Sequence, residues 1–395
     1  MHLADQLVAL GGAFLAAALI ARAGRRIDLP TIPLFIFAGI MFGPNTPGIV
    51  LFDNPADLKL LATLGLIFLL FYLGLEFSVD QIIEGGRRLA FSGIGYIAIN
   101  VGGGFLFGLA LGWGFEEALV LAGVLGISSS AIATKILIER KRMGNPETRL
   151  ILGIIVIEDL FLALYLAVVT PIINGGGSAS EIALDVLISF LFLLSLACVA
   201  RWGTKLVAKL IDSDETELLV VAFVGLTVLV AGVAEELGVS DAIGAFMIGL
   251  IIGETALRDR VEKAVLPLRD LFGALFFFYF GLQLVPEAVL DLLPTVLVAV
   301  LLTLVLNGCA GILAARLNDL GRLEAARISL TAVARGEFAL ILVTLAASAK
   351  LDPRIASFTA GYVLILAIIG PLMASRSKWF LPLIPARLFP RESGS

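Results

Sequence analysis

The stretch Phe-Tyr-Leu-Gly-Leu-Glu at residues 71–76 returns 207 positions later as Phe-Tyr-Phe-Gly-Leu-Gln at residues 278–283. A second pair, Phe-Ala-Gly at 37–39 and Met-Ile-Gly at 247–249, is separated by the similar distance of 210 positions. Similar spacings over so long a distance indicate that the chain is built from two related halves.

Both copies lie in long apolar runs. The chain has 395 residues, of which 59% are hydrophobic and 15% are charged, whereas soluble domains are nearer ~45–50% apolar and ~25% charged. This composition excludes a soluble enzyme. A membrane-spanning helix needs roughly 20 mostly apolar residues, and the sequence predicts thirteen such spans. They are 3–22, 28–44, 58–77, 87–112, 116–138, 148–172, 181–205, 216–237, 240–254, 265–285, 288–313, 323–348 and 354–375.

The second half begins seven spans after the first. Because seven is odd, the two halves are predicted to have opposite topologies in the membrane. Inverted repeats are typical of secondary transporters, whose substrate site lies near the bilayer midplane. The predicted fold class is therefore an all-α membrane protein with 13 transmembrane helices in an inverted repeat.

The basic residues predict the orientation of these spans. Of the 28 Lys and Arg residues, 23 fall in loops after odd-numbered spans or at the span edges beside them, three in or beside loops after even-numbered spans, and two, Lys135 and Arg335, deeper inside spans. Basic loops stay in the cytoplasm. We therefore expect a multi-pass protein of the cell membrane with its N-terminus outside and its C-terminus in the cytoplasm.

Several classes of function are excluded by what the sequence lacks. The single histidine is His2, so the usual general base and transition-metal ligand are missing. Cys198 and Cys309 both lie in apolar runs, which argues against a disulfide framework or a zinc site. The chain has no basic face for nucleic acid and no nucleophile–base pair, so it is not predicted to be an enzyme or to hold a cofactor.

Few charged residues lie at span centres. Span 148–172 carries Glu158 and Asp159 there, and span 323–348 carries Arg335 and Glu337. Each such charge costs roughly 2.5–3.5 kcal/mol on insertion scales, so these residues are expected to pair or to face a water-filled cavity. The alternative to a transport site is an ion pair that only holds two helices together, but the two acids Glu158 and Asp159 carry more charge than Arg335 alone neutralises. Adjacent helical residues also point about 100° apart, so the two acids cannot serve one partner in the same way.

Span 116–138 carries no charge at its centre but reads Gly-Ile-Ser-Ser-Ser at 126–130. Serines compete for backbone groups and favour a helix break, although small residues also simply allow close helix packing. The 207-residue spacing carries Ser128 onto Arg335, beside Gly336, and this match favours breaks in both spans. Arg335 would then offset the exposed carbonyl dipoles at the ends of the half-helices.

Three other polar residues inside spans have plainer explanations. Lys135 either extends to the membrane interface or serves the site. Asn100 and Asn307, also 207 residues apart, are expected to hydrogen-bond between helices rather than to bind substrate.

Four motifs resemble the second monovalent cation/proton antiporter superfamily, and within it the membrane subunits of KhtTU-type potassium/proton antiporters. They are Gly-Leu-Glu-Phe at 74–77, Ser-Ser-Ser-Ala-Ile-Ala at 128–133, Glu-Asp at 158–159 and Arg-Gly-Glu-Phe at 335–338. The resemblance covers essentially the whole chain. Kef-type relatives typically carry Gln at the position of Glu158, and the electrogenic sodium branch typically carries Asp there.

The resemblance implies a sodium/proton antiporter-like fold and a homodimer, with spans 5 and 12 as crossing, broken helices. It implies scaffold or dimerisation helices at 1–86 and 213–287, a mobile core at 87–175 and 288–379, a connecting helix at 176–212 and a short cytoplasmic tail at 380–395. It also implies a separate cytoplasmic regulatory subunit of the RCK type, since no regulatory domain follows the last span.

The predicted function is antiport of a monovalent cation, potassium by resemblance, against protons. In this hypothesis Asp159 binds the cation and the proton in turn, and Glu158 pairs with Arg335 or assists as a second acid. Ser128, Ser129 and Ser130 supply further oxygens, while Arg335, Glu337 and Lys135 balance charge. Sodium/proton antiport, a cation channel and an organic-anion symporter are the alternatives.

Overall fold

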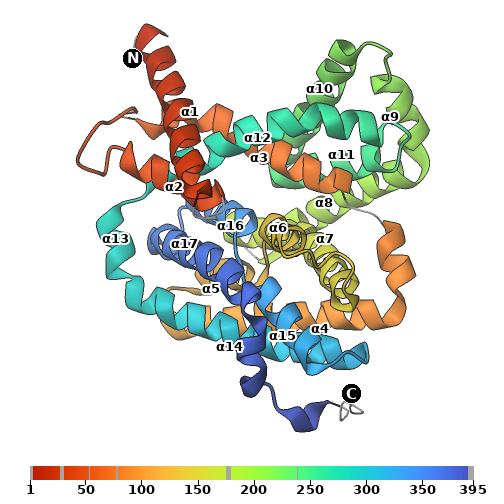
Figure 1. Ribbon diagram of the computed structural model, residues 1–395. Coiled ribbons are helices and arrows are strands. Elements are labelled where there is room, and N and C mark those ends of the chain that lie inside the picture. The colour runs from red at the N-terminus through yellow and green to blue at the C-terminus, as the bar shows by residue number, and fades with distance from the viewer. Residues whose placement is uncertain are drawn as a thin grey trace. The chain divides into compact units, whose positions relative to one another are not determined.

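The computed structural model describes residues 3–26, 31–52, 54–76, 79–174, 179–237 and 239–389 (Figure 1). Every regular element in these ranges is a helix, which confirms the predicted all-α class. The sequence-predicted tail 380–395 is described only as far as residue 389, and the Gly-Gly-Gly-Ser run at 175–178 lies outside the described residues.

The chain divides into two compact units. Unit 1 comprises residues 1–78 and 163–284, and unit 2 comprises residues 79–162 and 285–395. The helices of unit 1 are α1 (Leu3–Arg25), α2 (Thr31–Met41), η1 (Pro55–Leu58), α3 (Lys59–Glu76), α8 (Ala179–Cys198), the π-helix η2 (Val199–Gly203), α9 (Thr204–Ile211), α10 (Thr216–Glu236), α11 (Asp241–Gly253) and α12 (Arg258–Gln283). Those of unit 2 are α4 (Val79–Leu111), α5 (Phe115–Gly126), α6 (Ser130–Glu139), α13 (Pro286–Asp291), α14 (Leu293–Leu317), α15 (Arg322–Thr331), α16 (Glu337–Ser348), α17 (Arg354–Ser375), η3 (Ser377–Leu383) and η4 (Ala386–Leu388). Helix α7 (Pro146–Asn174) begins in unit 2 and ends in unit 1.

The predicted spans correspond to these helices with differences in length. Nine helices in the described residues are long and apolar enough to cross a membrane, and three more, α2, α11 and α16, are shorter apolar helices. The total of thirteen spans therefore stays a prediction. Of the span predicted at 28–44, residues 28–30 lie outside the described residues, and α2 covers Thr31–Met41. The helix ends there because Gly43 and Pro44 follow it and proline cannot continue a helix.

The repeat predicted from the sequence is visible in unit 1, where the close contact between α3 and α11 recurs between α12 and α2. A Cβ atom on Gly74 of α3 would lie 2.1 Å from the carbonyl oxygen of Phe246 and 3.0 Å from Cα of Gly249 in α11. A Cβ atom on Gly281 of α12 would lie 2.9 Å from Cα of Gly39 in α2. Since Gly74 matches Gly281 and Gly39 matches Gly249 in the repeat, backbones approach closely at equivalent places in both halves.

Unit 2 contains the two broken spans. Helix α5 ends at Gly126 and α6 begins at Ser130, while α15 ends at Thr331 and α16 begins at Glu337. The breaks predicted in spans 116–138 and 323–348 are thereby confirmed. The two non-helical segments also touch, since the backbone N–H of Ser129 donates to the carbonyl oxygen of Ala334 at 2.9 Å.

Candidate functional site

The first break is stabilised by its own serine run. Ile127 adopts an extended conformation after α5, and Ser129 is the N-cap of α6, its hydroxyl accepting from the backbone N–H of Ile132 at 3.3 Å. A serine N-cap satisfies one of the amide groups that a helix start leaves without an intrahelical partner. The run Ser-Ser-Ser therefore both ends one half-helix and begins the next.

The second break brings a glycine against the first. A Cβ atom on Gly336 would lie 2.7 Å from the hydroxyl oxygen of Ser129. A side chain at 336 would therefore displace the Ser129 hydroxyl from its present position, and glycine leaves room for it.

Arg335 lies between two helix ends. Its Nε and Nη2 atoms donate to the carbonyl oxygen of Leu125 at 3.0 and 2.6 Å, and Nη1 donates to the carbonyls of Ala332 and Val333 at 2.7 and 3.1 Å. Leu125 is in the last turn of α5, and Ala332 follows α15 directly. One fully buried guanidinium thus compensates the negative ends of two half-helix dipoles.

This arrangement confirms one expectation for Arg335 and corrects another. The expected compensation of carbonyl dipoles is present. The ion pair with Glu158, one of the two roles left open for that acid, is not present among the described residues; the guanidinium donates instead to the carbonyl oxygens of Leu125, Ala332 and Val333. The last carbonyl groups of a helix have no intrahelical donor, so they are available to accept hydrogen bonds from the guanidinium.

The two glutamates instead bind the serines. Glu158 of α7 accepts from the hydroxyl of Ser128 and from its backbone N–H, the latter at 3.4 Å. Glu337, the first residue of α16, accepts from the hydroxyls of Ser129 at 2.8 Å and Ser130 at 3.4 Å. Both carboxylates are buried at the N-terminal side of half-helices, where the helix dipole favours negative charge.

Asp159 is the next residue of α7 and is also buried, with 6% of its surface exposed. Its position about 100° around the helix from Glu158 separates the two acids, as the sequence predicted. Lys135 belongs to α6, but its side chain lies outside the described residues. The structure therefore brings together Glu158, Glu337 and Arg335 around the three serines, with Asp159 beside them.

Comparisons with known proteins establish the family of the chain. The family model described as "Sodium/hydrogen exchanger, transmembrane" matches residues 13–376. The chain belongs to the sodium/hydrogen exchanger family. The K(+)/H(+) antiporter subunit KhtU of Bacillus subtilis (strain 168) is 41% identical to this exchanger. The match covers 95% of the exchanger and 94% of KhtU.

A more distant relative and a solved structure extend this similarity. The ammonium/H(+) antiporter subunit AmhT of Alkalihalophilus pseudofirmus is 27% identical over 89% of the exchanger and 87% of its own length. The sodium proton antiporter MjNhaP1 of Methanocaldococcus jannaschii superposes with a TM-score of 0.73 at 16% identity, over 94% of the exchanger and all of that structure. At that identity the superposition establishes the fold alone.

A set of buried polar side chains lies on the helices of unit 2 of the exchanger. The hydroxyl of Tyr96 donates to Oδ1 of Asn307, whose Nδ2 donates to Oδ1 of Asn100 at 3.1 Å. The hydroxyls of Thr303 and Tyr362 lie 2.6 Å apart. The expectation that Asn100 and Asn307 hydrogen-bond between helices is confirmed; the two bond to each other between α4 and α14, at equivalent positions of the two repeats.

The sequence did not reveal a buried ion pair at the start of α7. Nη1 of Arg327 in α15 lies 3.0 Å from Oε1 of Glu147, which is fully buried and also accepts from Nδ2 of Asn145 at 3.0 Å. No periodicity or motif relates two residues separated by 180 positions, so only the fold could show this contact.

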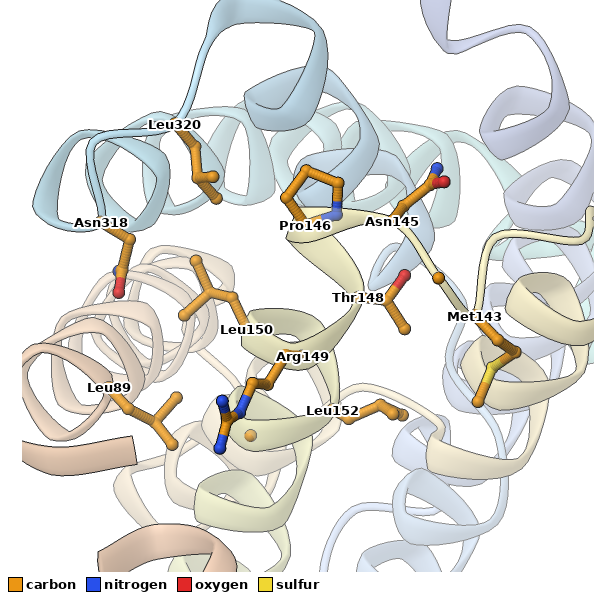
Figure 2. Close-up of a pocket in the computed structure, with 12 residues that line it drawn as sticks. Leu89, Met143, Asn145, Pro146, Thr148, Arg149, Leu150, Leu152, Asn318 and Leu320 are labelled. Atoms are coloured by element: carbon orange, nitrogen blue, oxygen red, sulfur yellow. The ribbon is translucent and has the colours of Figure 1, made fainter. Parts of the chain in front are cut away.

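A cavity of about 590 Å³ lies beside this pair in unit 2 (Figure 2). Its described lining includes Asn145, Thr148 and Arg149 from the start of α7, with Leu89 and Asn318 on other elements. The predicted ion-binding residues are not among those that line it, so the cavity and the candidate site are separate features.

Proposed function

We propose that the exchanger is a potassium/proton antiporter that carries its ions at Asp159. The cation is proposed from the K(+)/H(+) antiporter subunit at 41% identity, and the site from the burial of Asp159 beside the broken helices. A single carboxylate that takes up a proton and a cation in turn couples the two fluxes by competition. No second binding site is then needed.

The arrangement of helix ends supports the same assignment. The guanidinium of Arg335 already compensates the carbonyl ends of α5 and α15, so it does not neutralise the acids by direct pairing. Glu158 and Glu337 are held by serine hydroxyls. Under this proposal Asp159 is the titrating group, Glu158 assists as a second acid, and Ser128–Ser130 offer further oxygen ligands to a cation.

The proposed transport cycle is alternating access, with residues 87–175 and 288–379 as the moving core and residues 1–86 and 213–287 as the scaffold. The division of the chain into two compact units supports this assignment. So does the placement of all the described candidate ion-binding residues within unit 2, which holds both broken spans.

We further propose a homodimer and a separate cytoplasmic regulatory subunit. Two relatives are named as antiporter subunits, which supports a partner chain. The basic loops, assigned to the cytoplasm by the excess of Lys and Arg, supply a surface for it. Co-purification with the product of a neighbouring gene, followed by flux with and without that product, tests the partner.

Proton flux in proteoliposomes tests the function itself. A preformed pH gradient should dissipate when potassium is added and not when choline replaces it, and the rate should saturate with potassium. A response to sodium alone would favour sodium/proton antiport, which is the activity named for the structural neighbour. Unitary currents in planar bilayers would instead indicate a cation channel.

A further inference from the structure

Helix α9 and the π-helix before it carry two parallel rows of exposed side chains. The apolar row consists of Trp202, Leu206 and Leu210, and the basic row consists of Arg201, Lys205 and Lys209. Residues four apart share one face of a helix, so each row runs along the helix and the two rows lie side by side. The apolar residues are 76%, 73% and 69% exposed, which is unusual for side chains of this size.

The opposite face of α9 is attached to unit 1. Ile211 is buried, and the Asp212 that follows accepts from Nη1 of Arg260 at 3.0 Å. The helix contains no acidic residue of its own. The acids that follow, from Asp212 to Glu217, lie beyond the last residue of the helix, so they do not interrupt the basic row.

The apolar row continues an exposed apolar surface on α8. Leu187, Phe190, Leu191 and Leu194 of α8 are also exposed, and residues 186–211 form one candidate membrane span. Figure 1 shows the chain turning between α8 and α9, where the π-helix Val199–Gly203 interrupts the regular helix. The rows therefore lie where a spanning helix ends, on the side that the excess of Lys and Arg assigns to the cytoplasm.

We propose that the basic row binds the headgroups of anionic phospholipids in the cytoplasmic leaflet while the apolar row lies among their acyl chains. This proposal rests on the orientation assigned above. An amphipathic helix with Lys and Arg beside Trp and Leu is suited to the membrane interface. A soluble partner explains the basic row but not an apolar row that continues the surface of a membrane span.

Quenching of Trp202 fluorescence by brominated lipids tests the proposal without measuring transport. The test protein is the full chain carrying Trp113→Phe and Trp379→Phe, so that Trp202 is the remaining tryptophan. Brominated phosphatidylglycerol should quench Trp202 at a surface fraction roughly tenfold lower than brominated phosphatidylcholine. Each basic residue near an anionic surface favours binding about fivefold, and neighbouring residues share headgroups.

Two variants complete the experiment. Arg201→Gln, Lys205→Gln and Lys209→Gln together should abolish the preference for phosphatidylglycerol while both lipids still quench. The matched control, with Arg140→Gln, Lys141→Gln and Lys378→Gln, removes three exposed basic residues of unit 2 and should keep the preference. Equal quenching by both lipids in the parent protein overturns the proposal. Quenching by aqueous iodide but by neither lipid also overturns it and would indicate a surface for a soluble partner. Protection of Trp202 from all three quenchers overturns it as well and would indicate a protein interface. None of these readouts depends on which cation is transported.

Discussion

Arg335 binds the backbone of Leu125, 210 residues away, through two of its nitrogens, with the Nη2 hydrogen bond at 2.6 Å. The same guanidinium caps the end of α15 through the carbonyl of Ala332. A buried cation is expensive unless it is fully hydrogen-bonded, and here the hydrogen bonds come from the carbonyls that two broken helices leave open. The breaks and the arginine therefore depend on each other.

Removing this cation should destabilise the protein. Arg335→Ala leaves at least two buried carbonyls without donors, and at about 1–3 kcal/mol for each such group the expected loss is about 3 kcal/mol. Arg335→Lys should recover only part of it, since one ammonium group cannot reach both helix ends in the same geometry. Melting temperatures in detergent, with the exposed Arg140→Ala as control, measure this. Equal melting temperatures for Arg335→Ala and the control would contradict the role of the arginine.

Ser129 and Ser130 provide a matched pair at the first break. Ser129 caps α6 and donates to Glu337 at 2.8 Å, whereas among the described residues the hydroxyl of Ser130 makes one contact, with Glu337 at 3.4 Å. Ser129→Ala should therefore lower the free energy of unfolding by about 1 kcal/mol, and Ser130→Ala by clearly less. Chemical or thermal denaturation of both variants compares them. A larger loss for Ser130→Ala would show that the cap is not what stabilises the break.

The local features of the site could be predicted from the sequence, and its long-range pairings could not. Mid-span serines and a glycine beside a charge predicted both breaks, because these residues act on their own backbone. The polar character of Asn100 and Asn307 inside apolar spans predicted hydrogen bonds between helices, but that the two bond to each other is shown only by the fold. The sequence also predicted that Arg335 compensates the carbonyls at the helix ends, because the break and the arginine lie in the same span. The particular carbonyl of Leu125 and the bond between Glu158 and Ser128 depend on how helices pack, which no spacing encodes.

Asp159→Asn should abolish exchange without unfolding the protein. The amide is nearly isosteric with the carboxylate but neither takes up a proton nor offers a charged ligand, so flux should fall to the level of protein-free liposomes. Glu158→Gln, which can keep a hydrogen bond to Ser128, should slow exchange and leave it measurable. The melting temperature of Asp159→Asn should stay closer to the parent than that of Arg335→Ala. Proton-coupled flux retained in folded Asp159→Asn would move the carrier role to Glu158.

The predicted orientation places the loop after α6 in the cytoplasm and the loop after α16 outside. Lys141 and Lys350 are exposed in these two loops and can each be replaced by cysteine after Cys198→Ser and Cys309→Ser. In intact cells an impermeant maleimide should label Lys350→Cys and not Lys141→Cys, and permeabilisation should make both reactive. Labelling of both positions in intact cells would contradict the predicted topology.

The duplicated glycine contact in unit 1 can be tested with two glycines that both lie inside helices, one closely packed against a neighbouring backbone and the other with open space beside it. A Cβ atom on Gly249 would lie 2.0 Å from the carbonyl oxygen of Phe71, whereas nothing lies within 4 Å of one on Gly225 in α10. Gly249→Ala forces the backbones of α11 and α3 apart, and overpacking of this kind costs about 1–3 kcal/mol. Gly225→Ala should leave stability unchanged or raise it by up to about 1 kcal/mol, since alanine favours helix more than glycine does. Gly249→Ala should therefore melt several degrees below Gly225→Ala. Gly39→Ala should behave like Gly249→Ala, because it disturbs the equivalent crossing of α2 and α12. If Gly249→Ala and Gly225→Ala melted alike, the close approach of α3 and α11 would not be a feature of the folded protein.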